Sequence, residues 1–157
     1  MSEKQLTAGD VAEFFIALGN ETGESITNLR LQKLVYYAQA WHLANFGKPL
    51  FEDEFQAWVH GPVVEELYHN YKQFSFRPIE RELDISEVES RFSDDQLGFL
   101  KEVADVYMTY TAYELEKMSH NEDPWIIARA GLPADEACNN VVTKESMMEY
   151  YGEKIKD

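Results

Sequence analysis

The stretch NLRLQKLVYYAQAWHLAN, residues 28–45, sets the centre of the predicted fold. A helix is expected here, with Thr27 or Asn28 as its N-cap and Gly47 as its C-terminal stop. Its apolar residues include one stripe of helical spacing, made of Leu31, Leu34, Val35, Ala38 and Trp41. More apolar side chains lie beside that stripe, and a helix that is apolar over so much of its surface is usually central in a domain. The stretch therefore predicts a central helix against which the other elements pack.

Further helices are predicted on either side of the central one. They cover approximately residues 10–19, 62–77, 94–118, 123–131 and 144–155. Gly61-Pro62 is expected to open the second of them, since proline fits the first turn of a helix. Residues 93–96 (SDDQ) and 119–122 (SHNE) have the spacing of capping boxes, and Thr143 can cap the last helix.

The remaining segments leave room for a small β element. Residues 50–60 contain aromatic and branched side chains and are expected to form a short strand or an extended segment. Residues 79–92 are charged and weakly periodic, which suits a surface loop or a short strand pair. The fold class predicted is mainly α: a single compact helical domain, residues 1–157, of about six helices with a small β element.

The length and composition are those of an ordinary globular domain. The chain has 157 residues, of which 45% are hydrophobic and 27% charged, so disordered, collagen-like and fibrous classes are excluded. It contains no uncharged apolar run near the ~20 residues that span a bilayer, and residues 1–5 do not lead into the apolar core of a signal peptide. A cytoplasmic protein is therefore expected.

The net charge narrows the classes of partner. Lys and Arg total 14 against 29 Asp and Glu, a net charge of −15. A field of this sign repels phosphate backbones and anionic lipid surfaces, so neither autonomous nucleic-acid binding nor membrane binding is expected. A basic protein partner is favoured, although a solvated acidic surface without a recognition role explains the charge equally well.

The sequence shows no pattern of an enzyme or a cofactor-binding protein. The single cysteine, Cys138, excludes an intrachain disulfide and a CxxC motif. Glycine-rich phosphate loops, GxSxG, HExxH and EF-hand patterns are absent, and no two of the four histidines are spaced as helix-borne metal ligands. We therefore predict no enzymatic activity and no catalytic, cofactor or metal site. A small metal- or His-dependent enzyme, with His60 and His120 converging beside acidic groups, remains the less favoured alternative.

Two segments are rich in residues with special local chemistry, residues 57–64 and residues 118–129. In the second, Trp125 and Arg129 lie four residues apart on one helical face. They suit a stacked cation–π pair or an interface anchor. The alternative is core packing for Trp125 and an ordinary surface ion pair for Arg129.

Three ordered motifs carry a resemblance to a known family. They are LRLQKLVYYAQAWH at residues 29–42, GKPLF at 47–51 followed by AWVHGPVV at 57–64, and SH, DPW and AR within residues 119–129. Together they resemble the Panacea domain of SocA-like antitoxins, a family that includes GepA-like phage-associated proteins. The resemblance spans about residues 10–155, and His60 stands where the family usually has an aromatic residue.

The resemblance implies a bacterial or phage protein, mostly helical, that acts as the antitoxin of a toxin–antitoxin pair. Such antitoxins neutralise a cognate toxin, usually encoded by an adjacent gene, through direct protein–protein binding. One branch of the family instead delivers its toxin to a AAA+ protease, so a proteolytic adaptor is the alternative, with residues 150–157 as the natural docking tail. Members with a helix-turn-helix also exist, but none is expected in this chain, whose length leaves no room for one and whose acidity disfavours DNA binding.

The candidate partner-binding residues follow from the motifs and the aromatic content. They are Gln32, Lys33, Tyr36, His60, Gly61, Pro62, Tyr68, His120, Trp125 and Arg129. An exposed patch lined by Tyr36, Tyr68, Trp125 and Arg129 is expected, because Trp, Tyr and Arg are the residues that most often dominate interfaces.

Overall fold

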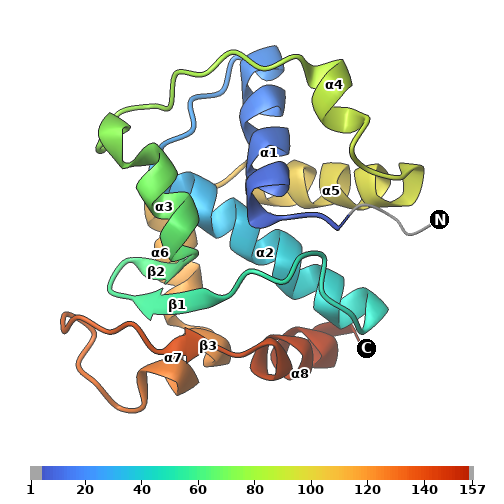
Figure 1. Cartoon of the computed structure of the whole chain (residues 1–157). Coiled ribbons are helices and arrows are strands. Elements are labelled where there is room, and N and C mark those ends of the chain that lie inside the picture. Colours follow the sequence, from blue (N-terminus) through green and yellow to red (C-terminus); the bar gives the residue numbers. More distant parts are fainter. Residues whose placement is uncertain (1–4, 156–157) are drawn as a thin grey trace.

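The structure, a computed structural model, describes residues 5–155 and is mainly helical (Figure 1). Its elements are α1 (Ala8–Thr22), α2 (Asn28–Phe46), β1 (Phe55–Trp58), β2 (Gly61–Val63), α3 (Glu65–Tyr71), the 3-10 helix η1 (Lys72–Phe74), α4 (Ile85–Glu89), α5 (Asp94–Tyr107), α6 (Ala112–His120), α7 (Asp123–Arg129), β3 (Val141–Val142) and α8 (Lys144–Ile155). The predicted mainly helical fold with a small β element is confirmed. Residues 1–4, where no signal peptide was expected, and the last two residues of the predicted docking tail lie outside the described residues.

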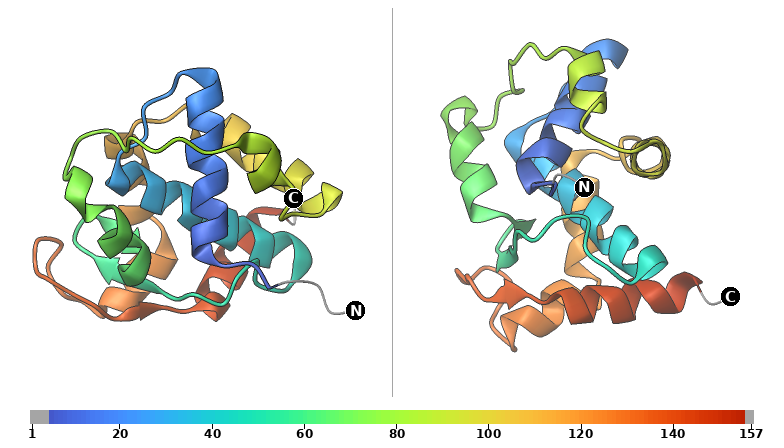
Figure 2. Two further views of the ribbon diagram at one scale, coloured as in Figure 1. Left: turned by 45° about the horizontal axis from the view of Figure 1, so that its top comes forward. Right: turned by 45° about the vertical axis from the view of Figure 1, so that its right-hand side comes forward.

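Helix α2 is the centre of the fold, as its sequence predicts. Every residue from Leu31 through Ala40 is buried, and α1, α5, α6 and α8 pack around the helix (Figures 1 and 2). The Thr27 hydroxyl accepts from the Arg30 amide at the N-terminus of α2, and Gly47 ends it with a φ of 69°. Both caps are those that the sequence indicates.

The small β element is a three-stranded antiparallel sheet of order β2-β1-β3. Ala57 pairs with Pro62 and Trp58 pairs with Gly61, so Val59 and His60 form the hairpin turn. The prediction that Gly61-Pro62 opens a helix is therefore wrong. Gly61 has a φ of 111°, which a helix does not allow, and Pro62 sits in an edge strand, where its missing N–H is tolerated. The helix begins only at Glu65.

The single helix predicted over residues 94–118 is two helices, α5 and α6. The Thr111 hydroxyl accepts from the Glu114 amide, and the Glu114 carboxylate accepts from the Thr111 amide, so Thr111 starts a new helix with a capping box. This break raises the helix number above the predicted six or so. The short α4 adds to it, in the segment that was expected to be a surface loop or a short strand pair.

The two serine capping boxes differ in outcome. Ser93 accepts from the Gln96 amide and Gln96 accepts from the Ser93 amide, so the first box is confirmed. The second is wrong, because α6 continues through His120 and the Ser119 hydroxyl donates to the Glu116 carbonyl of that helix. Helix α7 starts without a side-chain cap, with proline in its first turn.

Candidate functional site

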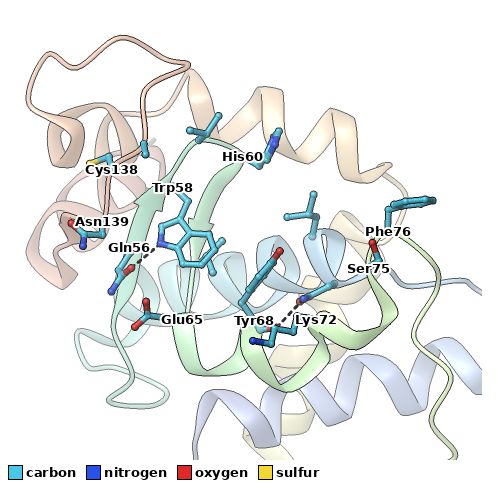
Figure 3. Close-up of a pocket in the computed structure, with 15 residues that line it drawn as sticks. Gln56, Trp58, His60, Glu65, Tyr68, Lys72, Ser75, Phe76, Cys138 and Asn139 are labelled. Carbon is cyan, nitrogen blue, oxygen red and sulfur yellow. Dashed lines mark hydrogen bonds between the residues drawn. The ribbon is translucent and has the colours of Figure 1, made fainter.

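A groove of about 770 Å³ lies between the β1–β2 hairpin, α3 and the loop that precedes β3 (Figure 3). Three aromatic side chains form its apolar surface: Trp58 from the end of β1, Tyr68 from α3 and Phe76 from the segment after η1. We call it the aromatic groove. Phe76 is 86% exposed, and Trp58 and Tyr68 are half-buried, so all three remain accessible to another molecule.

The walls of the aromatic groove are held by specific contacts. The Trp58 indole donates to the Gln56 side chain at 2.7 Å, and the Trp58 and Tyr68 rings meet edge to face with centroids 5.0 Å apart. The Asn28 side chain, at the start of α2, donates to the Tyr68 carbonyl at 3.0 Å. These contacts fix the strand wall and the helix wall relative to the central helix.

The rim of the aromatic groove is polar and carries both signs of charge. Glu65 and Lys72 lie on one side, and Asn139 lies near Cys138 on the other (Figure 3). His60 is exposed at the hairpin turn, and its Nδ1 lies 3.1 Å from the Glu116 carboxylate. An apolar centre with a polar rim is the arrangement of a protein-binding surface.

Beneath the hairpin, residues of three motifs converge on Gly61. A Cβ added to Gly61 would lie 2.9 Å from Cε of Lys33 and 3.0 Å from the Ser119 hydroxyl. Gly61 is therefore required both by its positive φ and by the close approach of α2 and α6. The motif residues support the hairpin whose outer face forms one wall of the aromatic groove.

Lys33 is fully buried in this support, and its ammonium has no hydrogen-bond partner within residues 5–155. Burial lowers the pKa of Lys33 to about 8, although the neighbouring Glu116 favours the charged form. Burial also lowers the pKa of His120, again against the attraction of Glu116. Within the part of the chain that the structure describes, no group of three or more His, Cys, Asp or Glu side chains is placed to hold a metal ion.

Trp125 and Arg129 form a cation–π pair, with the guanidinium carbon 4.8 Å from the ring centroid. Both are buried, and the His120 ring stacks on the Trp125 ring at a centroid distance of 4.1 Å. Arg129 also donates to the carbonyls of Ala57 at 2.8 Å and Pro133 at 2.7 Å, and to that of Glu136. The alternative of an ordinary surface ion pair for Arg129 is therefore wrong, because the side chain is buried and its two terminal nitrogens donate to backbone carbonyls inside the protein. Its Nε has no hydrogen-bond partner within residues 5–155.

The expected exposed patch of Tyr36, Tyr68, Trp125 and Arg129 is not present. Tyr36 is buried and its hydroxyl lies 3.2 Å from that of Tyr151; of the four, Tyr68 alone has substantial exposed surface. The periodicity of a helix does not distinguish a side chain that faces solvent from one that faces a second layer of helices, and α8 covers this side of α2.

The other candidate residues divide between support and surface. Gln32 is buried and links the Asn28 side chain to the Val64 amide, and Pro62 is buried in β2. His60 and Tyr68 line the aromatic groove, whereas His120 does not. The structure therefore places most of the candidates in or beneath the hairpin, and His60 and Tyr68 are the two that line the accessible groove.

Sequence reasoning named Tyr68 as a candidate but missed other residues of this region, among them Lys72 and Phe76. Tyr68, Lys72 and Phe76 recur at four-residue spacing, a signal that could have indicated one shared wall. Glu122 was assigned only a capping role, yet its carboxylate accepts from the hydroxyls of Tyr37 and Tyr151, each at 2.7 Å. Only the fold reveals that contact, because the three residues lie on three helices or their ends.

Comparison with known proteins gives a family. The family described as antitoxin SocA-like, Panacea domain, matches residues 31–126, which is more than half of the chain. Antitoxin SocA of Caulobacter vibrioides is 46% identical over 43 residues, which are 27% of this chain and 23% of that relative's length. No solved structure matches the chain. No helix within residues 5–155 combines the length and apolar character needed to cross a bilayer. With its motifs gathered around one hairpin and residues 31–126 matched, the chain belongs to the SocA-like antitoxin family of Panacea-domain proteins.

Proposed function

We propose that this protein is an antitoxin that acts in the cytoplasm and neutralises a cognate toxin by binding it directly, with no bond-making chemistry of its own. The observation that carries the proposal is the family match over residues 31–126. The name of the relative from Caulobacter vibrioides supports the same role. The toxin is expected to be encoded by an adjacent gene.

We assign the toxin contact to the aromatic groove. Phe76 is exposed, and Trp58 and Tyr68 beside it are half-buried, so the groove offers aromatic surface to a partner. Aromatic side chains often dominate the binding energy of interfaces, because they provide a large contact area at a low cost in conformational entropy. The net charge of −15 favours a basic partner and speeds its association. Glu65 and Lys72 at the rim then select the orientation of the bound segment.

Co-expression of the protein with the product of the adjacent gene tests this function. Restored growth and a complex recovered by pull-down are the expected results. Phe76→Asp places a charge in the groove without disturbing packing, because the side chain is 86% exposed, and is expected to weaken the complex and the rescue. Ile127→Asp is the matched control, an exposed apolar residue of α7 that does not line the groove. Neither rescue nor a complex with the wild-type chain would refute the proposal.

The half-life of the toxin in cells separates occlusion from delivery. If the protein acts by occlusion, the toxin half-life is unchanged or longer when the protein is present. A shorter half-life that depends on a AAA+ protease would instead make the protein an adaptor. Loss of binding with Phe76→Asp is expected in both cases, so this measurement is needed to distinguish them.

A further inference from the structure

A second groove lies on another part of the molecule, between the C-terminal half of α2 and the outer side of α5. Its volume is about 610 Å³, and no residue lines both it and the aromatic groove. Figure 2, in its right-hand view, shows α5 end-on beside α2. Trp41, Phe46 and Phe99 form its apolar wall together with Val106. We call it the acidic groove, because Asp94, Asp95 and Glu102 also line it.

The apolar wall of the acidic groove is ordered and open to solvent. The Phe46 and Phe99 rings meet edge to face at 5.7 Å, and the Trp41 indole donates to the Tyr107 hydroxyl at 2.6 Å. Phe46 and Val106 are each 54% exposed, one from each helix. Large apolar side chains held at the surface of two neighbouring helices are typical of a groove that receives a third helix.

The charged side chains that line this groove all have one sign. They are Asp94, Asp95 and Glu102, all exposed and all without an ion pair or side-chain hydrogen bond within residues 5–155. Elsewhere on the surface, by contrast, Asp10, Glu13 and Glu87 all form ion pairs with Arg91. Lys48 lies two residues after Phe46 in the chain but does not line the groove. The unpaired carboxylates around an apolar wall complement a segment with Lys or Arg beside apolar residues.

Gly98 is an independent observation on the same face of α5. Glycine is a poor residue for the interior of a helix, because it has the largest backbone entropy to lose. A Cβ at Gly98 would meet no atom within 4 Å, so packing inside this chain does not require glycine here. The missing side chain lets another backbone approach the helix closely at the floor of the groove.

We propose that the acidic groove is a second docking surface, which binds a basic amphipathic helix of a partner protein. The apolar face of that helix packs between Phe46 and Val106, its backbone passes over Gly98, and its Lys or Arg side chains reach the three carboxylates. The inference goes beyond the proposed function, since it concerns a different surface and does not require that the partner be a toxin. A second copy of this chain is disfavoured as the occupant by its own charge of −15.

Fluorine NMR of the full chain labelled with fluorotryptophan reports on each surface separately. Trp41 lines the acidic groove, Trp58 lines the aromatic groove, and Trp125 is buried. The probe is a synthetic peptide of about 18 residues, or five helical turns, in which Leu and Lys follow helical periodicity. A scrambled peptide of the same composition, and one with Glu for Lys, are the controls. The Leu–Lys peptide is expected to shift the Trp41 signal alone.

Two substitutions of glycine sharpen the test. Gly98→Leu is expected to leave the thermal midpoint equal or higher, because leucine favours helix and the position is open, yet to weaken peptide binding at least about tenfold by filling the groove. Gly152→Leu, an equally open position in α8 that does not line the groove, is the control and is expected to bind as wild type. Replacing Asp94, Asp95 and Glu102 by their amides is expected to reduce affinity about tenfold at low salt and to flatten its salt dependence.

Several results would overturn the proposal. They are a Trp41 signal that does not move, a Gly98→Leu variant that binds as well as wild type, or equal binding of the scrambled peptide. A Trp41 signal that changes with protein concentration alone, together with a dimer in sedimentation, would assign the groove to a second copy instead. A shift of Trp58 rather than Trp41 would place the basic helix in the aromatic groove and leave the proposed function standing.

Discussion

Tyr151, in the last helix, donates its hydroxyl hydrogen to the Glu122 carboxylate at 2.7 Å and so ties α8 to the start of α7. Tyr37 of α2 donates to the same oxygen at the same distance, and the Tyr36 hydroxyl lies 3.2 Å from that of Tyr151. One partly buried carboxylate therefore joins three helices. Burial raises the pKa of Glu122 above its ordinary value of 4.5, against the two hydroxyl donors that favour the anion.

The first prediction concerns the pH dependence that Glu122 gives to folding. The folded state binds the Glu122 proton more tightly than the unfolded state does, so this contribution to stability is full below pH 4.5 and is lost as pH rises through the raised folded pKa. Glu122→Gln keeps an acceptor for both tyrosines and removes the charge. The variant is expected to stay within about 1 kcal/mol of wild type at pH 7 and to lose this part of the pH dependence.

Urea denaturation of both chains between pH 5 and pH 8 measures the effect. Glu122→Ala is the contrasting variant, because it leaves the Tyr37 hydroxyl without an acceptor and leaves Tyr151 only the Tyr36 hydroxyl, and it is expected to cost about 1–3 kcal/mol. If Glu122→Gln were as destabilising as Glu122→Ala, the carboxylate charge itself would hold the three helices together.

The second prediction concerns Lys33, whose folded pKa is about 8 against an ordinary 10.5. Between pH 8 and pH 10.5 the unfolded chain keeps the Lys33 proton and the folded chain has lost it. The free energy of unfolding therefore rises with pH over this range, and the increase is lost again as pH falls through 8. The difference between the two values corresponds to roughly 3 kcal/mol of differential free energy. Lys33→Met is therefore expected to stabilise the fold at pH 7 by up to roughly that amount.

The difference in unfolding free energy between Lys33→Met and wild type isolates this group from the tyrosines, which titrate in the same range. The difference should shrink as pH rises above 8. Lys101→Met is the matched control, because Lys101 is exposed and pairs only with Glu89 at 3.6 Å. A stabilisation by Lys33→Met that does not vary with pH would show that the gain comes from packing alone.

The sequence was sufficient for the helices whose signals are local. The caps at Thr27, Gly47 and Ser93 and the apolar stripe of α2 are all observed. The break between α5 and α6 also had a local signal, the Thr111–Glu114 capping box, but two continuous apolar faces masked it.

The remaining differences needed contacts between distant segments. Pro62 suits a helix start and an edge strand equally well, and the pairing of Ala57 with Pro62 decides between them. The expected exposure of Tyr36, Trp125 and Arg129 failed because α8 and the β hairpin cover them, which no periodicity within one helix encodes. Phe76 of the aromatic groove lies outside every motif and acquires a role only through its neighbours in space.

The third prediction tests the close approach beneath the hairpin. Gly61→Ala is expected to destabilise the fold by roughly 2–4 kcal/mol, because a φ of 111° strains an L-residue and the new Cβ would lie 2.9 Å from a buried carbon of Lys33. Gly131→Ala is the matched control, with a φ of 86° and no atom within 4 Å of the added Cβ. It carries the backbone strain alone, so thermal denaturation should rank Gly61→Ala as the more destabilising change. Equal losses would mean that the contact with Lys33 relaxes freely.

The fourth prediction concerns Arg129, whose guanidinium holds the loop between α7 and β3. It donates to the carbonyls of Pro133 and Glu136 in that loop and to that of Ala57 in β1. The planar guanidinium makes these hydrogen bonds together, and the ammonium of a lysine cannot reproduce their geometry. Arg129→Lys is therefore expected to cost roughly 2–4 kcal/mol and to free residues 130–140. Hydrogen exchange should rise in that loop and at β1 before the rest of the fold opens.

Arg77→Lys is the matched control for that change, because Arg77 is exposed and donates only to the nearby carbonyls of Gln73 and Phe74. Its exchange pattern is expected to match wild type. Since Asn139 of the freed loop and Trp58 of β1 both line the aromatic groove, Arg129→Lys should also weaken toxin binding without altering any exposed side chain of the groove. Unchanged exchange at residues 130–140 in this variant would show that the loop is held by other contacts, such as the Asn140 side chain on the Ala128 carbonyl.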